Sequence, residues 1–188
     1  MSKLSLVVAS GLLGPAPARA HPRCATLSAC SSTTPNTNLD RNPSMTPERI
    51  GLVQQGFRAV APIRTEAAAI FYRRLFTIAP ELRALFGSTD MAAQGNKLMA
   101  SLGFVVQGLK QPDIILPAIE ALARRHAGYG VRDVHYEIVG QALIETLEEG
   151  LGDAFTPRAR EAWQAAYTML SQVMVAASRT SERPETLP

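Results

Sequence analysis

From residue 46 onward, apolar residues recur at helical spacing, and prolines break this pattern into separate segments. Four of the prolines precede an apolar helical pattern, at positions 62, 80, 112 and 157. Proline suits the first turn of a helix, because its missing N–H would have no partner there in any case. The pattern predicts helices over about 46–60, 62–78, 80–86, 90–109, 112–126, 133–151 and 157–178.

The same region lacks the sequence signals of other fold classes. It holds no Asn-Gly turn between alternating strands, no Gly-rich phosphate loop and no nucleophile elbow. Helices of these lengths can pack ridges into grooves around a core with room for a ligand. The sequence therefore predicts an all-α fold of about seven helices, in one domain over residues 45–178.

Composition and charge exclude two classes of partner. The formal net charge is only +3, and the arginines and lysines are scattered, without a basic stripe interleaved with aromatic residues. No apolar run approaches the roughly 18 residues of a membrane-spanning helix. We therefore expect no nucleic-acid partner and no transmembrane segment.

The first 44 residues differ from the rest of the chain. A lysine, an apolar run over 4–13 and small residues around a cleavage site after Ala20 fit a secretory signal. Alternatively, Met45 is the true start, since Thr46 and Pro47 open a helix directly after it. We expect disorder over 14–44 in either case, and again in the tail over 179–188. The first interpretation predicts an exported protein, and the second a cytoplasmic one.

His126 lies on the apolar face of the segment over 112–126. Ile115, Ile119, Leu122 and His126 follow one another at helical spacing, which places their side chains on one side of a helix. Without other information, a single histidine on such a face is most often a core residue. His135 precedes the inward face of the next predicted helix, so we expect its side chain to point sideways or to be exposed.

The residues alone leave more than one role open for His126. Structural zinc needs four ligands, but the helical domain offers only His126 and His135, and both cysteines, Cys24 and Cys30, lie in the first 44 residues. Haem iron needs a single protein ligand, and a large apolar pocket supplies the remaining binding energy. Haem ligation and plain core packing therefore both remain possible roles for His126.

Five markers, four sequence segments and the residue Phe86, match one family in order and spacing. FYRRLFTIAPELRALF is similar to the second and third helices of globins, and Phe86 ends it at the position of an aromatic that packs against haem. QGNKLM, from Gln94, is similar to the distal helix, and LARRHAGYGVRDVHYEIVGQALIETL to the proximal helix and its successor. FTPRAREAWQAAY is similar to the start of the final helix. The chain thus resembles globins over about 46–178, especially bacterial single-domain globins and the globin part of flavohaemoglobins.

This resemblance implies a globin fold around one pocket that holds haem b, with its iron. His126 takes the place of the proximal iron ligand. Tyr72 and Gln94 take distal positions, where they would donate hydrogen bonds to a bound gas. Glutamine is a poor iron ligand, so the resting iron would be five-coordinate or water-bound. The other residues expected to contact haem are Phe86, Leu98, Leu122, Val131, Tyr136 and Val139, with Lys97 and Arg125 near its propionates.

One position departs from the flavohaemoglobin pattern. In those proteins a Tyr and a Glu flank the proximal His. Tyr136 matches the Tyr, but Ser178 stands where the Glu is expected. Without that carboxylate His126 would have less anionic character, which argues against strong peroxidase-like activation of bound O₂.

Three functions follow from the resemblance as hypotheses. The first is reversible O₂ binding, for transport or storage. The second is nitric oxide dioxygenase, in which bound O₂ reacts with NO to give nitrate and an external reductase restores the iron. The third is a gas sensor or a haem-free interaction module. The small ligands would be O₂, NO or CO, and the chain would be a monomer or a homodimer.

Overall fold

A computed structural model of the protein describes residues 45–87 and 89–181. Within these residues the chain forms helices and short 3-10 turns, and no strand. The α-helices are α1 (Pro47–Val60), α2 (Arg64–Ile78), α3 (Arg83–Phe86), α4 (Met91–Gly108), α5 (Pro112–Gly128), α6 (Asp133–Leu151) and α7 (Pro157–Ser181). The predicted all-α class is therefore confirmed. The expectations for residues 1–44 and for the tail beyond 181 lie outside the described residues.

Several helix boundaries differ from the prediction. A 3-10 turn occupies Ala61–Ile63, so α2 begins at Arg64 rather than at Pro62, and a second turn, Pro80–Leu82, precedes α3. The fixed φ of proline suits the first position of either helix type, so the sequence could not distinguish them. At its C-terminal end, α7 continues to Ser181, three residues past the predicted end.

Side-chain caps fix where three of the helices begin. The cap residues are Thr46, Asp90 and Thr156, which precede α1, α4 and α7. Each side-chain oxygen accepts a main-chain N–H of the first turn, from Arg49 at 3.3 Å, Ala92 at 2.9 Å and Ala159 at 3.2 Å. These bonds satisfy N–H groups that have no partner inside the helix. The cap predicted at Thr46 is confirmed.

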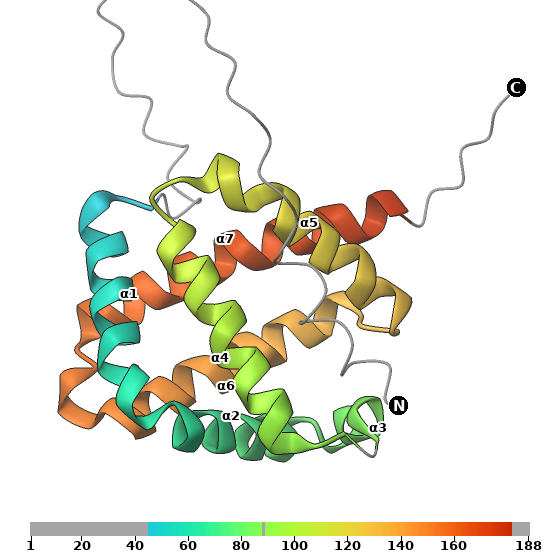
Figure 1. The fold of residues 1–188 in the computed structure, drawn as a ribbon, viewed down its shortest axis with the longest axis horizontal. Helices are drawn as coiled ribbons and strands as arrows, with labels where there is room; N and C mark the ends of the chain where they lie inside the picture. The colour runs from blue at the N-terminus through green and yellow to red at the C-terminus, as the bar shows by residue number, and fades with distance from the viewer. Residues whose placement is uncertain (1–44, 88, 182–188) are drawn as a thin grey trace, which may run out of the picture.

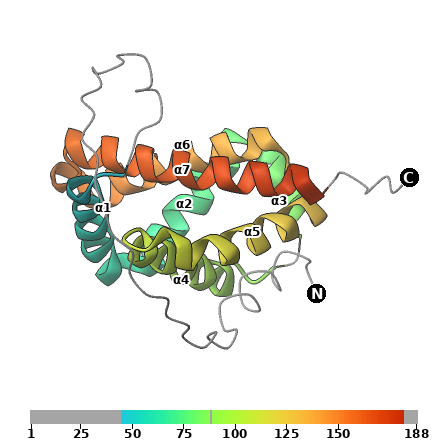
Figure 2. The same ribbon diagram turned by 90° about the horizontal axis from the view of Figure 1, so that it is seen from above.

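Two pairs of helices lie on opposite sides of the interior of the molecule. Figure 2 shows α6 and α7 along one side, α4 and α5 along the other, and α1 at one end. α2 packs against both α6 and α4, while α5 and α1 pack against α7 (Figure 1). No helix among the described residues is long and apolar enough to cross a membrane. Helices thus face the interior from several directions, which is the arrangement that a buried site requires.

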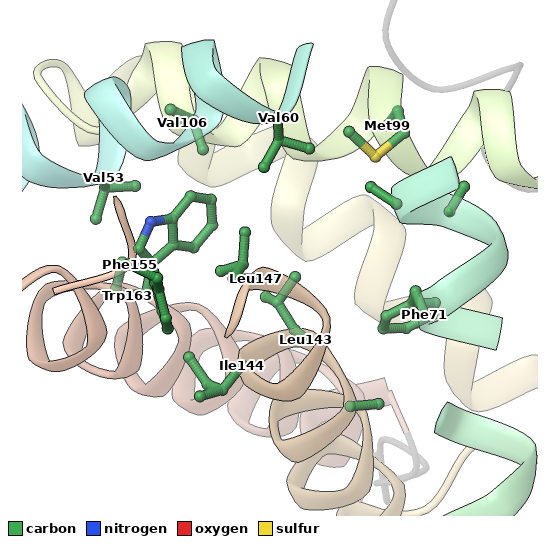
Figure 3. Close-up of a cluster of buried hydrophobic side chains, with 14 of the residues drawn as sticks. Val53, Val60, Phe71, Met99, Val106, Leu143, Ile144, Leu147, Phe155 and Trp163 are labelled. Atoms are coloured by element: carbon green, nitrogen blue, oxygen red, sulfur yellow. The ribbon is translucent and has the colours of Figure 1, made fainter. Parts of the chain in front are cut away.

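The main core extends from the end of the molecule where α1 meets α6 and α7 to the buried faces of α2 and α4. Trp163 of α7 is 2% exposed, and its indole lies beside Val53 of α1 and Leu147 of α6 (Figure 3). Burying aliphatic side chains of this size stabilises a fold by roughly 1.5–3 kcal/mol each. A second, smaller cluster gathers Ile115, Ile119 and Ala123 of α5 with Tyr136 of α6 and Met174 of α7. This second cluster supports the helix that carries His126.

α2 and α4 cross at very short range. A Cβ added to Gly95 of α4 would lie 2.9 Å from the Cβ of Ala68 on α2, well inside van der Waals contact. Both residues are buried. The missing side chain at Gly95 therefore sets the separation of the two helices, and its neighbour Gln94 is brought close to α2.

We expect Gly95→Ala to lower the free energy of unfolding by about 1–3 kcal/mol, because the added methyl overpacks the α2–α4 contact. Urea denaturation followed by circular dichroism measures this. Gly51→Ala is the matched control, since Gly51 is exposed on α1 and an added Cβ meets nothing within 4 Å. That change should stabilise the helix by roughly 0.5–1 kcal/mol. Equal stabilisation by both substitutions would contradict a tight crossing.

Candidate functional site

An apolar cavity lies among α2, α4, α5, α6 and α7. It has a volume of about 230 Å³ and is partly open to solvent. Most of its wall is hydrocarbon, from residues that include Phe71, Leu75, Leu82, Leu85, Leu102, Val105, Leu143, Leu170 and Met174. An apolar cavity that a few polar groups enter from different elements is the usual form of a cofactor or small-molecule site.

The cavity brings together residues that lie far apart in the sequence. Those predicted to contact a cofactor or its ligand, and found in its wall, are Tyr72, Phe86, Gln94, Leu98, Leu122, His126, Val131, Tyr136 and Val139. Lys97 and Arg125 are not among the lining residues, and each makes other interactions within the protein. Their contacts with a cofactor stay predictions.

His126 enters the cavity near the end of α5 with one ring nitrogen already committed. Its Nδ1 lies 2.9 Å from the carbonyl oxygen of Leu122, one helical turn back. A carbonyl only accepts, so Nδ1 carries the proton and Nε2 keeps its lone pair. Burial lowers the pKa of the imidazole, and the bond to Leu122 opposes that shift more weakly. His126 is therefore a neutral ring with one nitrogen available to a metal ion.

Among the described residues, no three His, Cys, Asp or Glu side chains gather where they could together hold a metal ion. Around His126 the cavity wall is instead apolar, with Leu122 and Val131 as neighbours in the lining. Such surroundings suit a group that brings its own metal ligands and a large apolar surface.

Tyr72 and Gln94 form the polar part of the cavity wall that α2 and α4 supply. They are 7% and 5% exposed. Burial raises the pKa of the Tyr72 phenol to about 12, while a hydrogen bond with the Gln94 side chain opposes the shift. A bond that lowers this pKa is one in which the amide N–H donates to the phenol oxygen. The Tyr72 hydroxyl thus keeps its own proton to donate, and the Gln94 Oε1 has no partner.

Aromatic rings hold Tyr72 in place. Phe71 and Phe86 meet its ring edge to face, with centroids 5.1 Å and 5.4 Å away. Phe76 packs in turn against Phe86 at 5.3 Å and lies under the guanidinium of Arg83. Edge-to-face contacts of this kind fix ring orientation as well as burying area. The phenol therefore has a defined direction in the cavity.

A second pair of tyrosines forms the wall near the start of α6. The Tyr167 hydroxyl donates to the main-chain oxygen of Tyr136 at 2.6 Å. Gly140 makes room for this ring, since a Cβ there would lie 2.5 Å from it. The Tyr136 hydroxyl is buried without a partner among the described residues. The Ser178 hydroxyl donates to the Val175 main-chain oxygen at 2.9 Å. The Ser178 position thus supplies no acceptor to Tyr136.

The expected orientation of His135 is wrong. Its side chain is 6% exposed and lines the cavity. The reason is its place in the first turn of α6, where the ring turns back and its Nδ1 accepts the main-chain N–H of Arg132 at 3.1 Å. Helical periodicity does not describe a side chain that caps its own helix. His135 is the third residue of the helix predicted from 133, a position from which a side-chain acceptor can bind the main-chain N–H that precedes the helix, and this was the sequence signal for the arrangement.

Comparison with known proteins identifies the family. The globin family model matches residues 69–174, which is more than half of the chain. The chain belongs to the globin family. A flavohemoprotein of Bordetella parapertussis is 34% identical over an alignment of 128 residues, which covers 65% of this chain and 32% of that protein. The chain therefore spans about a third of the length of the curated relatives it matches.

Solved structures agree on the globin fold. A carbene transferase engineered from a Rhodothermus marinus protein named for nitric oxide dioxygenase activity matches with a TM-score of 0.65 and 27% identity. The match covers 73% of this chain and 95% of that one. A flavohemoglobin of Malassezia yamatoensis, with bound FAD and heme, matches with a TM-score of 0.60 and 22% identity, over 72% and 37% of the two chains. The predicted globin fold is confirmed.

We expect the haem-free chain to lose stability as the pH falls from 7 to 5. Burial lowers the pKa of both His126 and His135 below the ordinary value. The unfolded chain then binds protons that the folded chain refuses, from about pH 6.5 down to the folded pKa, so acid favours unfolding in that window. Urea midpoints at pH 7, 6 and 5 measure the effect.

His126→Leu should flatten this pH dependence, because it removes one of the two groups that must become charged. Groups that titrate elsewhere in the protein contribute equally to both chains and cancel in the comparison. An unchanged slope in His126→Leu and in the double variant His126→Leu/His135→Gln would show that neither ring is held neutral by burial.

Proposed function

We propose that the chain binds haem b through His126 and that the bound haem reversibly binds dioxygen. The observation that carries the proposal is the hydrogen bond between His126 Nδ1 and the Leu122 carbonyl. With the Nδ1 proton donated to the Leu122 carbonyl, Nε2 is the one ring nitrogen left for iron, inside an apolar cavity. Haem iron needs a single protein ligand of this kind.

Two buried polar atoms support an occupant of the cavity. Gln94 Oε1 and the Tyr136 hydroxyl have no hydrogen-bond partner among the described residues, although both side chains line the cavity. Buried polar atoms of folded proteins are nearly always paired, so exceptions call for a missing ligand or water. The family adds support, since the Malassezia relative contains heme and the Bordetella relative is named a flavohemoprotein.

The distal residues suit a ligand that carries partial negative charge. Bound haem supplies an iron centre that binds dioxygen and gives it such charge. The Tyr72 phenol stays protonated at neutral pH, because its pKa is about 12, and it donates its O–H. Gln94 donates to the phenol oxygen and so orients that O–H. A hydrogen bond in a water-poor pocket favours the bound ligand by about 1–1.5 kcal/mol, roughly ten-fold in affinity.

The proximal side suits binding rather than cleavage of dioxygen. The acceptor for the His126 proton is a main-chain carbonyl, which is neutral. Ser178 turns its hydroxyl to the Val175 carbonyl, so it gives the ring no anionic partner. A less anionic histidine would push less electron density toward the iron of a bound haem, which would disfavour O–O cleavage.

Nitric oxide dioxygenase is the second candidate. The names of the relatives favour it, since the Rhodothermus protein is named for that activity and the Bordetella relative is a flavohemoprotein. The reaction leaves the iron oxidised, so turnover needs an external electron donor. Steady consumption of NO with an added reductase supports the enzyme, and a single turnover that stops in the ferric state supports an oxygen binder.

The full chain should take up one haem and show a Soret band that shifts on reduction and on CO binding. His126→Ala should lose this spectrum or most of the haem, because the iron loses its protein ligand. His135→Gln is the matched control, with a second cavity histidine replaced, and should keep the wild-type spectrum. Spectra of the two variants that are alike would count against His126 as the ligand, and absence of uptake by wild type would count against haem.

Tyr72→Phe should raise the rate of O₂ dissociation roughly ten-fold, because the bound ligand loses a hydrogen-bond donor while the ring packing stays. Stopped-flow displacement of O₂ by CO measures this rate. Tyr129→Phe is the matched control, since Tyr129 follows α5 and is not among the cavity-lining residues. Equal rates in Tyr72→Phe and wild type would show that the phenol does not touch the ligand.

A further inference from the structure

We propose that Arg132 and His135 form a binding point for one carboxylate at the edge of the cavity. Arg132 lies just before α6 and is exposed, whereas His135 is buried in the cavity wall. The pair thus lies at the boundary between the cavity and solvent. The inference rests on the proposed haem function where it names haem as one source of that carboxylate.

The protons on these two side chains conflict as the structure stands. The main-chain N–H of Arg132 donates to His135 Nδ1 at 3.1 Å, so Nδ1 has no proton and the neutral ring carries its proton on Nε2. That Nε2 lies 3.3 Å from Nη2 of the Arg132 guanidinium. A guanidinium nitrogen only donates. Two donors therefore face each other, and protonating the ring adds a second such conflict at Nδ1.

An oxygen that accepts from both groups removes the conflict. A carboxylate does this best, because it offers several lone pairs and a negative charge to a planar guanidinium and an imidazole N–H. The α6 N-terminus adds a partial positive charge at the same place. A bound carboxylate would thus turn an unfavourable donor pair into two charge-assisted hydrogen bonds.

No acidic residue that the structure describes already fills this role. Arg132 forms no ion pair with any residue that the structure describes. Asp133, next in the chain, pairs instead with Arg179 at 2.5 Å. Glu81 is exposed and acts on His135 only through its charge, which opposes the effects of burial and of Arg132. The acceptor must therefore come from outside these residues.

Two sources offer the same chemistry. Haem carries two propionate carboxylates, and His135 lines the cavity that haem would fill. A small free carboxylate such as formate is the alternative. The dimethyl ester of haem separates them, because it has the same ring and iron but no carboxylate.

The experiment measures haem loss from the full chain to an excess of a haem-accepting apoglobin, with haem and with its dimethyl ester. His135→Leu and Arg132→Gln should each lose haem roughly ten-fold faster than wild type, since a hydrogen bond to a charged group is lost. With the dimethyl ester they should match wild type. Arg124→Gln is the control, an exposed arginine of α5 whose partner is Glu120.

His135→Gln separates binding from helix capping. Glutamine keeps one acceptor for the Arg132 N–H and one donor for the carboxylate, so this variant should lose haem at nearly the wild-type rate. If His135→Leu loses haem and its dimethyl ester faster by the same factor, the haem propionates do not bind at this site. The carboxylate site is then refuted, and His135 acts only as a cap, unless formate slows loss of the dimethyl ester from wild type but not from His135→Leu.

Formate tests the second source. Added to wild type that holds the dimethyl ester, formate should slow its loss relative to chloride at equal ionic strength, and should have no effect in His135→Leu. That result shows that the site also accepts a free carboxylate once the haem propionates are esterified. Should wild type take up no haem at all, the proposed function fails alone. Formate-dependent thermal stabilisation of the haem-free chain, present in wild type and absent in His135→Leu, then supports the site, and its absence overturns it.

Discussion

The close crossing of α2 and α4 determines the shape of the pocket on its distal side. At Gly95 the two helices approach without an intervening side chain, and Ala68 fills the space from the other helix. Gln94 is next to Gly95, and Tyr72 is one turn beyond Ala68, so the same approach brings the amide to the phenol. A wider crossing would leave the same apolar walls but separate these two polar groups. The hydrogen-bonding capacity of the pocket is thus a consequence of backbone packing.

The polar side chains that line the pocket carry no formal charge at neutral pH. Burial keeps the His126 ring neutral and raises the pKa of Tyr72 and of Tyr136 to about 12, so all three are uncharged at pH 7. Polar groups in this state act through dipoles, which stabilise a ligand that carries partial charge without demanding an ion. The proposed gas ligands have this character. Full charge is found at the edge, on Arg132.

Much of the fold was predictable because its signals are local. The helical period, the prolines and the Thr46 and Thr156 caps each depend on neighbouring residues. His126 was found by the same means, since its position on an apolar face requires only the helix it belongs to. The prediction for the orientation of His135 was wrong for a different reason. In the first turn of α6 the side chain serves its own backbone, and that competes with the periodic pattern.

Other parts of the site depend on contacts that no local pattern contains. The hydrogen bond from Tyr167 to the Tyr136 carbonyl joins residues 31 apart in the sequence, and it needs the gap at Gly140 between two helices. The hydrogen bond between Tyr72 and Gln94 likewise depends on a helix crossing. Lys97 lies three residues after Gln94, yet it is not in the wall, because a helix turns most of its side chains away from any one cavity.

The acceptor for the His126 ring belongs to the main chain, and this has an evolutionary consequence. A carboxylate partner can be lost through one change of codon, but every residue at position 122 carries a carbonyl. Substitutions there would alter packing around the ring while leaving its proton acceptor in place, so long as α5 stays helical. The electronic character of the ring nitrogen that we propose as the iron ligand is therefore buffered against point mutation. On the opposite wall of the pocket, side chains supply the hydrogen bonds, so point mutations change them directly.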